Sequence, residues 1–105
     1  MVHHLVLFKL KPGTTDETVE NMMRETRMQL LKIPEVLNIK CGKRVDPDND
    51  WQFFLAVDFE SMNRLAVYTK DPIHVKYVEE IIKPNVSKRL ALDYEMEPGR
   101  DVKYS

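Results

Sequence analysis

Two segments of this chain predict β-strands that are apolar on both faces. In Trp51 to Phe59 the odd-numbered residues are all apolar, and Phe54 and Ala56 make the second face apolar as well. The same pattern recurs in His3 to Leu10. One face of this segment carries Val6, Phe8 and Leu10, and the other carries Leu5 and Leu7. Because a chain of 105 residues supplies enough helix for one face only, we expect a second copy of the chain to cover the other.

Composition limits the classes of protein to which the chain can belong. It is 43% hydrophobic and 31% charged, which favours a folded protein over a disordered one, and we expect no membrane span. Its 16 basic and 17 acidic residues form no long basic run, which argues against a nucleic-acid partner. With a single cysteine, Cys41, and no apolar leader, the expected location is the cytoplasm.

The order of the expected elements indicates an α+β, ferredoxin-like antiparallel four-stranded sheet with helices on one face. We expect one domain, residues 1–97, followed by a polar C-terminal tail, 98–105. The strands are expected at Val2 to Lys11, Val36 to Arg44, Trp51 to Phe59 and Lys88 to Glu95. The helices are expected from Thr14 to about Ile33, from Ser61 to about Lys70 and from Pro72 onward.

Helix starts and helix faces can also be predicted from the sequence. Thr14 to Glu17 is typical of a capping box at the start of the first helix. Residues at three- and four-residue spacing predict its inner face: Val19, Met22, Met23, Thr26 and Leu30. In the third helical segment we expect Val75, Val78, Ile81 and Ile82 to face inward.

Four segments of the chain closely resemble the stress-responsive A/B barrel domain family. They are Val2 to Gly13, Lys32 to Val36, Phe59 to Ser61 and Tyr68 to Val75, and the resemblance covers roughly Met1 to Glu95. It implies a dimeric α+β barrel in which two ferredoxin-like subunits face each other sheet to sheet. Some members of this kind, such as the plant polyketide cyclase olivetolic acid cyclase, close rings by an aldol-type reaction.

The resemblance to that cyclase also implies candidate catalytic residues. Tyr68 and His74 match the positions of its phenol and its base, and His4 matches a pocket histidine. The break at Asp71 and Pro72 lets the chain turn, so that Tyr68 and His74 can converge. The chain departs from the cyclase at Phe53, where another pocket histidine would stand.

We expect Tyr68 and His74 to lie in an apolar cavity between the sheet and the helices. The other expected ligand-binding residues are His4, Val6, Phe8, Met22, Met23, Thr26, Leu30, Phe53, Leu55 and Asp93. Asp93 is the carboxylate expected to orient a histidine, because its strand returns beside the first strand. The alternatives are that His4, Tyr68 and His74 are packing or capping residues, and that Asp93 pairs with Lys88 or Arg89.

Three functions remain open from sequence. The first is a homodimer that binds a small apolar or aromatic molecule, with or without catalysis. The second is an enzyme of the cyclase or cofactor-independent oxygenase type, and the third is a structural stress protein. We expect no cofactor, although related barrels bind haem through a histidine, and no metal, because His3 and His4 point to opposite faces of their strand.

Overall fold

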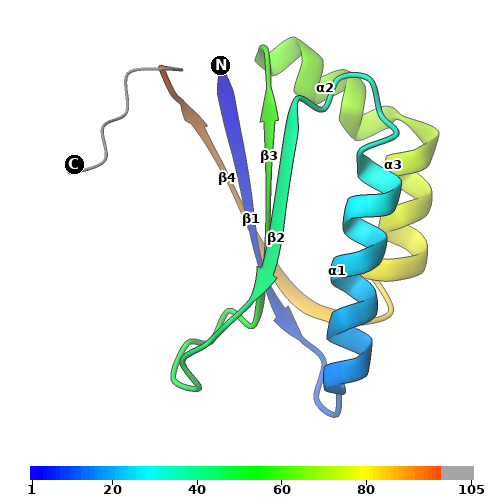
Figure 1. The fold of residues 1–105 in the computed structure, drawn as a ribbon, viewed down its shortest axis with the longest axis vertical. Helices are drawn as coiled ribbons and strands as arrows, with labels where there is room; N and C mark the ends of the chain where they lie inside the picture. The colour runs from blue at the N-terminus through cyan, green and yellow to red at the C-terminus, as the bar shows by residue number, and fades with distance from the viewer. Residues whose placement is uncertain (98–105) are drawn as a thin grey trace.

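A four-stranded antiparallel sheet forms one layer of the protein, whose structure is a computed structural model that describes residues 1–97. The strand order is β2-β3-β1-β4, so that β1 and β3 are central and β4 is an edge strand (Figure 1). The strands are β1 (Val2–Leu10), β2 (Asn38–Lys43), β3 (Phe53–Phe59) and β4 (Val86–Glu95). Thus β2 is shorter than predicted and β4 begins two residues earlier. The predicted polar tail, 98–105, lies outside the described residues.

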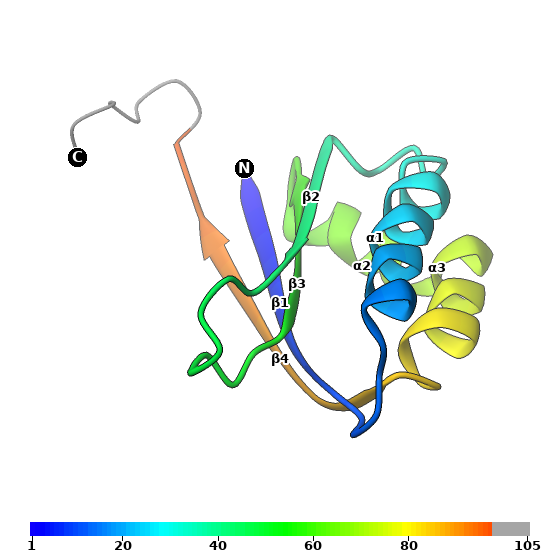
Figure 2. The same ribbon diagram turned by 60° about the horizontal axis from the view of Figure 1, so that its bottom comes forward.

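The helices form the second layer, and all of them lie on the same side of the sheet (Figures 1 and 2). They are α1 (Asp16–Leu30), α2 (Met62–Lys70), α3 (Pro72–Tyr77) and a single π-helical turn, η1 (Val78–Ile82), which continues α3. This arrangement confirms the predicted ferredoxin-like α+β fold. Within residues 1–97, none of these helices combines the length and the apolar character that a membrane crossing requires.

Side chains cap the helices where the chain enters them. The Ser61 hydroxyl accepts a hydrogen bond from the Arg64 N–H at 3.3 Å, as predicted for the start of α2. At α1 the N-cap lies one residue later than the predicted capping box places it. Thr15, rather than Thr14, accepts from the Thr18 N–H at 3.2 Å. The reason is that the Thr14 hydroxyl donates to the Lys11 carbonyl at 2.6 Å instead.

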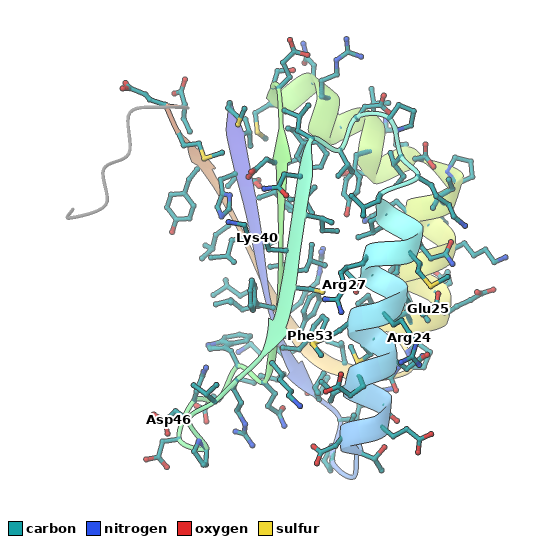
Figure 3. All side chains as sticks on the ribbon, viewed as in Figure 1. Arg24, Glu25, Arg27, Lys40, Asp46 and Phe53 are labelled. Atoms are coloured by element: carbon teal, nitrogen blue, oxygen red, sulfur yellow. The ribbon has the colours of Figure 1, made fainter. Side chains whose placement is uncertain are left out.

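The main core lies between α1 and the central strands. Met22, Thr26 and Leu30 of α1 are fully buried, and Phe53 lies between the sheet and α1 (Figure 3). The Thr26 hydroxyl donates to the Met22 carbonyl at 2.7 Å, which leaves it to accept from the Tyr77 hydroxyl at 2.5 Å. Thr26 is therefore a satisfied polar residue that links α1 to α3 inside the core.

In the third helical segment the prediction is confirmed for Val78, Ile81 and Ile82, which pack in or against the core, but not for Val75. Val75 is 48% exposed, while Tyr77 and Ile82 are buried and Ile73 packs against the core. A π-turn follows, in which the Lys83 N–H donates to the Val78 carbonyl five residues earlier at 2.9 Å, so the helical repeat changes within the segment. The prediction for Val75 is wrong because it assumed a single α-helical repeat through the whole segment.

The face of the sheet opposite the helices is uncovered and largely apolar. Leu7 of β1 lies opposite Phe54 of β3 and Leu90 of β4, and Leu5 lies opposite Ala56 and Leu92. We call the face formed by these six residues the bare face. The bare face is continuous across three strands because the pairings of β1 with β3 and with β4 place apolar residues of the three strands side by side.

Adjacent leucines at the end of α1 provide a test of this core. Leu30 is fully buried and Leu31 is 57% exposed. Leu30→Ala should lower the free energy of unfolding by about 2–5 kcal/mol, because it removes buried methyl groups and leaves a cavity. Leu31→Ala should change it by less than about 0.5 kcal/mol. Urea denaturation at one fixed protein concentration measures both, and equal losses would contradict this packing.

Candidate active site

A cavity of about 410 Å³ lies between the sheet and the α3–η1 segment. Its volume is within the range of small-molecule sites. Its wall takes residues from β1, β3, α2, α3, η1 and β4: His4, Val6, Phe8, Leu55, Tyr68, Thr69, His74, Tyr77, Val78, Ile82, Lys83, Val86, Ser87, Lys88 and Arg89. The exposed members of this wall mark the mouth of the cavity: Thr69, Lys83, Ser87, Lys88 and Arg89.

Tyr68 and His74 lie side by side in the wall of this cavity. Their ring centroids are 4.4 Å apart, with an angle of 49° between the planes. The chain turns between them at Asp71, whose backbone is extended and whose side chain accepts from the Ile73 N–H at 2.8 Å to begin α3. The break between α2 and α3 thus brings together two side chains that a continuous helix would separate.

The phenol of Tyr68 has no hydrogen-bonding partner within residues 1–97, although the residue is only 2% exposed. No side-chain oxygen or nitrogen in the described part of the chain is buried without a partner, so the phenol oxygen must reach the cavity surface. Burial raises the pKa of Tyr68. At neutral pH the phenol is therefore protonated and free to donate a hydrogen bond into the cavity.

His74 presents a neutral imidazole to the cavity. Its Nδ1 lies 3.0 Å from the Thr69 carbonyl oxygen, which can only accept, so Nδ1 carries the proton and Nε2 has a free lone pair. Burial lowers the pKa of His74, with smaller contributions from the nearby charges of His4 and Arg89. The Thr69 carbonyl and the Asp71 carboxylate oppose this shift. His74 is therefore largely deprotonated at pH 7.

His4 forms a second imidazole wall of the same cavity, and Asp93 holds it. Its Nδ1 lies 2.5 Å from Asp93 Oδ1 across the β1–β4 pair, and its ring meets Phe59 edge-on at 6.3 Å. Since the carboxylate accepts from Nδ1–H, the remaining nitrogen, Nε2, is the one available to other groups. Asp93 itself does not line the cavity, and it contacts His4 and not His74.

Several residues expected in the cavity belong to the core instead. Met22, Met23, Thr26, Leu30 and Phe53 pack under α1, and none of them lines the cavity. The structure differs from the prediction because α1 packs directly on the sheet, whereas the cavity opens beside β4. Sequence reasoning missed Tyr77, Val78, Ile82 and the β4 residues of the wall. The π-turn and the register shift of β4 at Lys9 and Leu10, which position them, have no clear sequence signal.

Outside the cavity, His3 of β1 pairs with a carboxylate of the neighbouring strand. His3 points to the bare face, where its Nδ1 lies 2.6 Å from Asp58 Oδ1, on the side of β1 opposite His4. Nowhere in residues 1–97 do three or more histidine, cysteine, aspartate or glutamate side chains converge as metal ligands.

Comparison with known proteins identifies the family. The sequence pattern of the Stress responsive A/B Barrel Domain matches residues 2–96. The chain belongs to this family. A curated relative is a stress-response A/B barrel domain-containing protein of Arabidopsis thaliana, which is 27% identical over 96 residues. The match covers 90% of this chain but 36% of the relative, so this A/B barrel chain spans about a third of the length of that protein.

Solved structures share the fold of this A/B barrel protein. A dimeric protein of unknown function with a ferredoxin-like fold from Bacteroides fragilis is 26% identical, with a TM-score of 0.76 over 90% of this chain and 95% of that one. Hydroxynitrile lyase from Passiflora edulis is 17% identical, with a TM-score of 0.79 over 92% of this chain and 94% of that one. The likeness to the lyase concerns the fold alone.

The protonation state of His74 can be measured directly. We expect its pKa, followed by NMR titration of the imidazole, to lie below the 6.5 of an unperturbed histidine, because the cavity wall buries the ring. Arg89→Gln should raise this pKa by removing a nearby positive charge. Unfolding restores the ordinary pKa, so the unfolded chain binds a proton at His74 more readily than the folded protein does. The free energy of unfolding should therefore fall as the pH decreases below about 6.5. A value at or above 6.5 would contradict the burial of the ring.

Proposed function

We propose that this protein is a homodimer that binds a small apolar or aromatic molecule in the cavity of each subunit. The observation that carries the proposal is a cavity with an apolar inner wall, beside which the Tyr68 hydroxyl and His74 Nε2 have no hydrogen-bonding partner among the described residues. Ligand sites of this kind combine apolar walls with a few convergent polar groups. Val6, Phe8 and Leu55 supply the apolar wall.

The bare face supports the dimer. It places Leu7, Phe54 and Leu90 in one row with no helix above them, and Leu90 is 39% exposed. An apolar sheet face that no helix covers favours association, and a self-complementary face suits a two-fold axis. The Bacteroides fragilis neighbour is itself described as dimeric. In a sheet-to-sheet dimer the helices and both cavities would lie on the outside.

A charge placed in the bare face should disrupt the dimer. Leu7→Glu would bury an unpaired carboxylate between the two sheets, so native mass spectrometry at micromolar concentration should show mainly single chains instead of pairs. Val67→Glu is the matched control, because Val67 is 51% exposed on α2, on the helical side of the molecule. A dimer that survives Leu7→Glu but not Val67→Glu would mean that the helices, and not the sheets, form the interface.

Blocking the cavity should abolish ligand binding. Ser87 is exposed at the mouth, and Ser87→Trp would fill this opening with an indole. We expect it to weaken the binding of 2-naphthol, a neutral aromatic probe, at least tenfold as measured by fluorescence titration. Asn63→Trp, on the exposed side of α2, should leave the binding unchanged.

Thermal unfolding of both tryptophan variants checks that they are folded. If the wild-type protein does not bind 2-naphthol at all, or if both variants bind it equally well, the ligand-binding proposal fails. The structural role, in which the assembly itself is the function, would then be the better hypothesis.

The pair of neutral imidazole and phenol favours an enzyme as the second candidate. His74 Nε2 could remove a proton next to a carbonyl group, while the Tyr68 hydroxyl donates a hydrogen bond to the developing enolate oxygen. Such acid–base steps contribute roughly 10²- to 10⁴-fold each. This chemistry would fit an olivetolic acid cyclase-like or cofactor-independent oxygenase-like reaction. Turnover that rises with pH through the pKa of His74 would separate such an enzyme from a binding protein.

A further inference from the structure

We infer that the ligand of this cavity is an apolar or aromatic molecule that carries one ionised carboxylate, and that Arg89 binds this carboxylate at the mouth. The inference rests on the proposed ligand-binding function and adds the charge of the ligand to it. It also assigns a binding role to Arg89, which the sequence indicated only as a possible partner of Asp93.

The charges around the cavity are the first observation. Lys83, Lys88 and Arg89 belong to its wall, and among the described residues no aspartate or glutamate does. The chain as a whole has a formal charge of −1, so the positive wall is a local feature rather than a result of composition. A cleft lined by one sign of charge attracts ligands of the opposite sign.

Of these three cations, Arg89 is the one that both lacks an ion pair among the described residues and faces the helical side of the sheet. The Lys83 ammonium is already paired with the Glu79 carboxylate at 2.5 Å. Lys88 lies opposite Lys9, whose ammonium is over the Trp51 ring on the side of the sheet away from the helices. Arg89 forms no ion pair within residues 1–97.

The register of β4 points Arg89 toward the cavity. It lies opposite Phe8, a buried residue of the helix-facing side and a member of the cavity wall. Its guanidinium is close enough to His74 for its charge to lower the pKa of that imidazole. Sheet-to-sheet pairing in the proposed dimer would leave Arg89 uncovered, since the opposite face would be the one buried.

No carboxylate of the described chain forms an ion pair with this guanidinium. The Asp71 carboxylate accepts from the Ile73 N–H at 2.8 Å and the Asp93 carboxylate contacts His4 at 2.5 Å, and neither is paired with Arg89. The positive charge of Arg89 is therefore left for a group that enters from solvent. The guanidinium fork matches the two oxygens of a carboxylate.

The charge balance favours a carboxylate over a phosphate. One free guanidinium compensates one negative charge, whereas a phosphate monoester carries nearly two at neutral pH. Lys83 is paired with Glu79 and Lys88 faces the other side of the sheet, so no second unpaired cation of the described wall points at the second charge. The expected ligand thus places its apolar part against Val6, Phe8 and Leu55 and its carboxylate at Arg89.

Three probes of similar shape test the inference: 2-naphthoate, its neutral amide 2-naphthamide, and 2-naphthyl phosphate. Isothermal titration calorimetry at low ionic strength should give 2-naphthoate an affinity about tenfold higher than that of 2-naphthamide, because one charge-assisted hydrogen-bonded pair is added. Added salt should weaken the binding of 2-naphthoate and not that of the amide. Arg89→Gln should remove the preference and leave the affinity for the amide unchanged.

Arg24→Gln is the matched control, since it removes the same charge from the exposed surface of α1 (Figure 3). It should keep the preference for 2-naphthoate. Equal binding of 2-naphthoate and 2-naphthamide to the wild-type protein would overturn the inference and leave the proposed function standing. Tighter binding of 2-naphthyl phosphate would overturn the assignment of a carboxylate. If none of the probes binds, the proposed function fails together with the inference.

Discussion

The antiparallel pairing of β1 with both β3 and β4 determines the positions of most of the residues discussed above. Side chains alternate between the two faces of a strand, so the register of one central strand fixes which groups meet on each side. This register places His4 opposite Asp93 and Phe8 opposite Arg89 on the helical side, and Leu7 between Phe54 and Leu90 on the other. A shift by one residue would exchange the cavity wall with the bare face.

The cavity exists because the helices cover the sheet unevenly. α1 packs closely on the central strands, and its buried residues fill the space there. β4 is exposed over most of its length and diverges from the helical layer (Figure 2). The break at Asp71 and the π-turn of η1 adjust which side chains of the last helical segment face this gap. The groups that can bind or react are thus concentrated beside the edge strand.

The sequence was sufficient to predict the fold because its signals are local and mutually consistent. Runs of residues that are apolar on both faces identified β1 and β3, Ser61 and Pro72 marked helix starts, and the α1 face from Val19 to Leu30 followed the helical repeat. The candidate site was harder to predict, because it depends on how layers pack. Nothing in the local pattern distinguishes Met22, which fills the core, from Val6, which lines the cavity. Only the three-dimensional structure could show that Asp93 contacts His4 and that Arg89 has no ion-pair partner in the described chain.

The consecutive histidines of β1 have a mechanical consequence. His3 is bound to Asp58 of β3 on one face, and His4 is bound to Asp93 of β4 on the other. The side chains of two consecutive residues therefore connect the central strand to both of its neighbours, one on each side of the sheet. The imidazole that borders the cavity is thus fixed to the edge strand, while its neighbour in the chain fixes β1 to the other central strand on the opposite face.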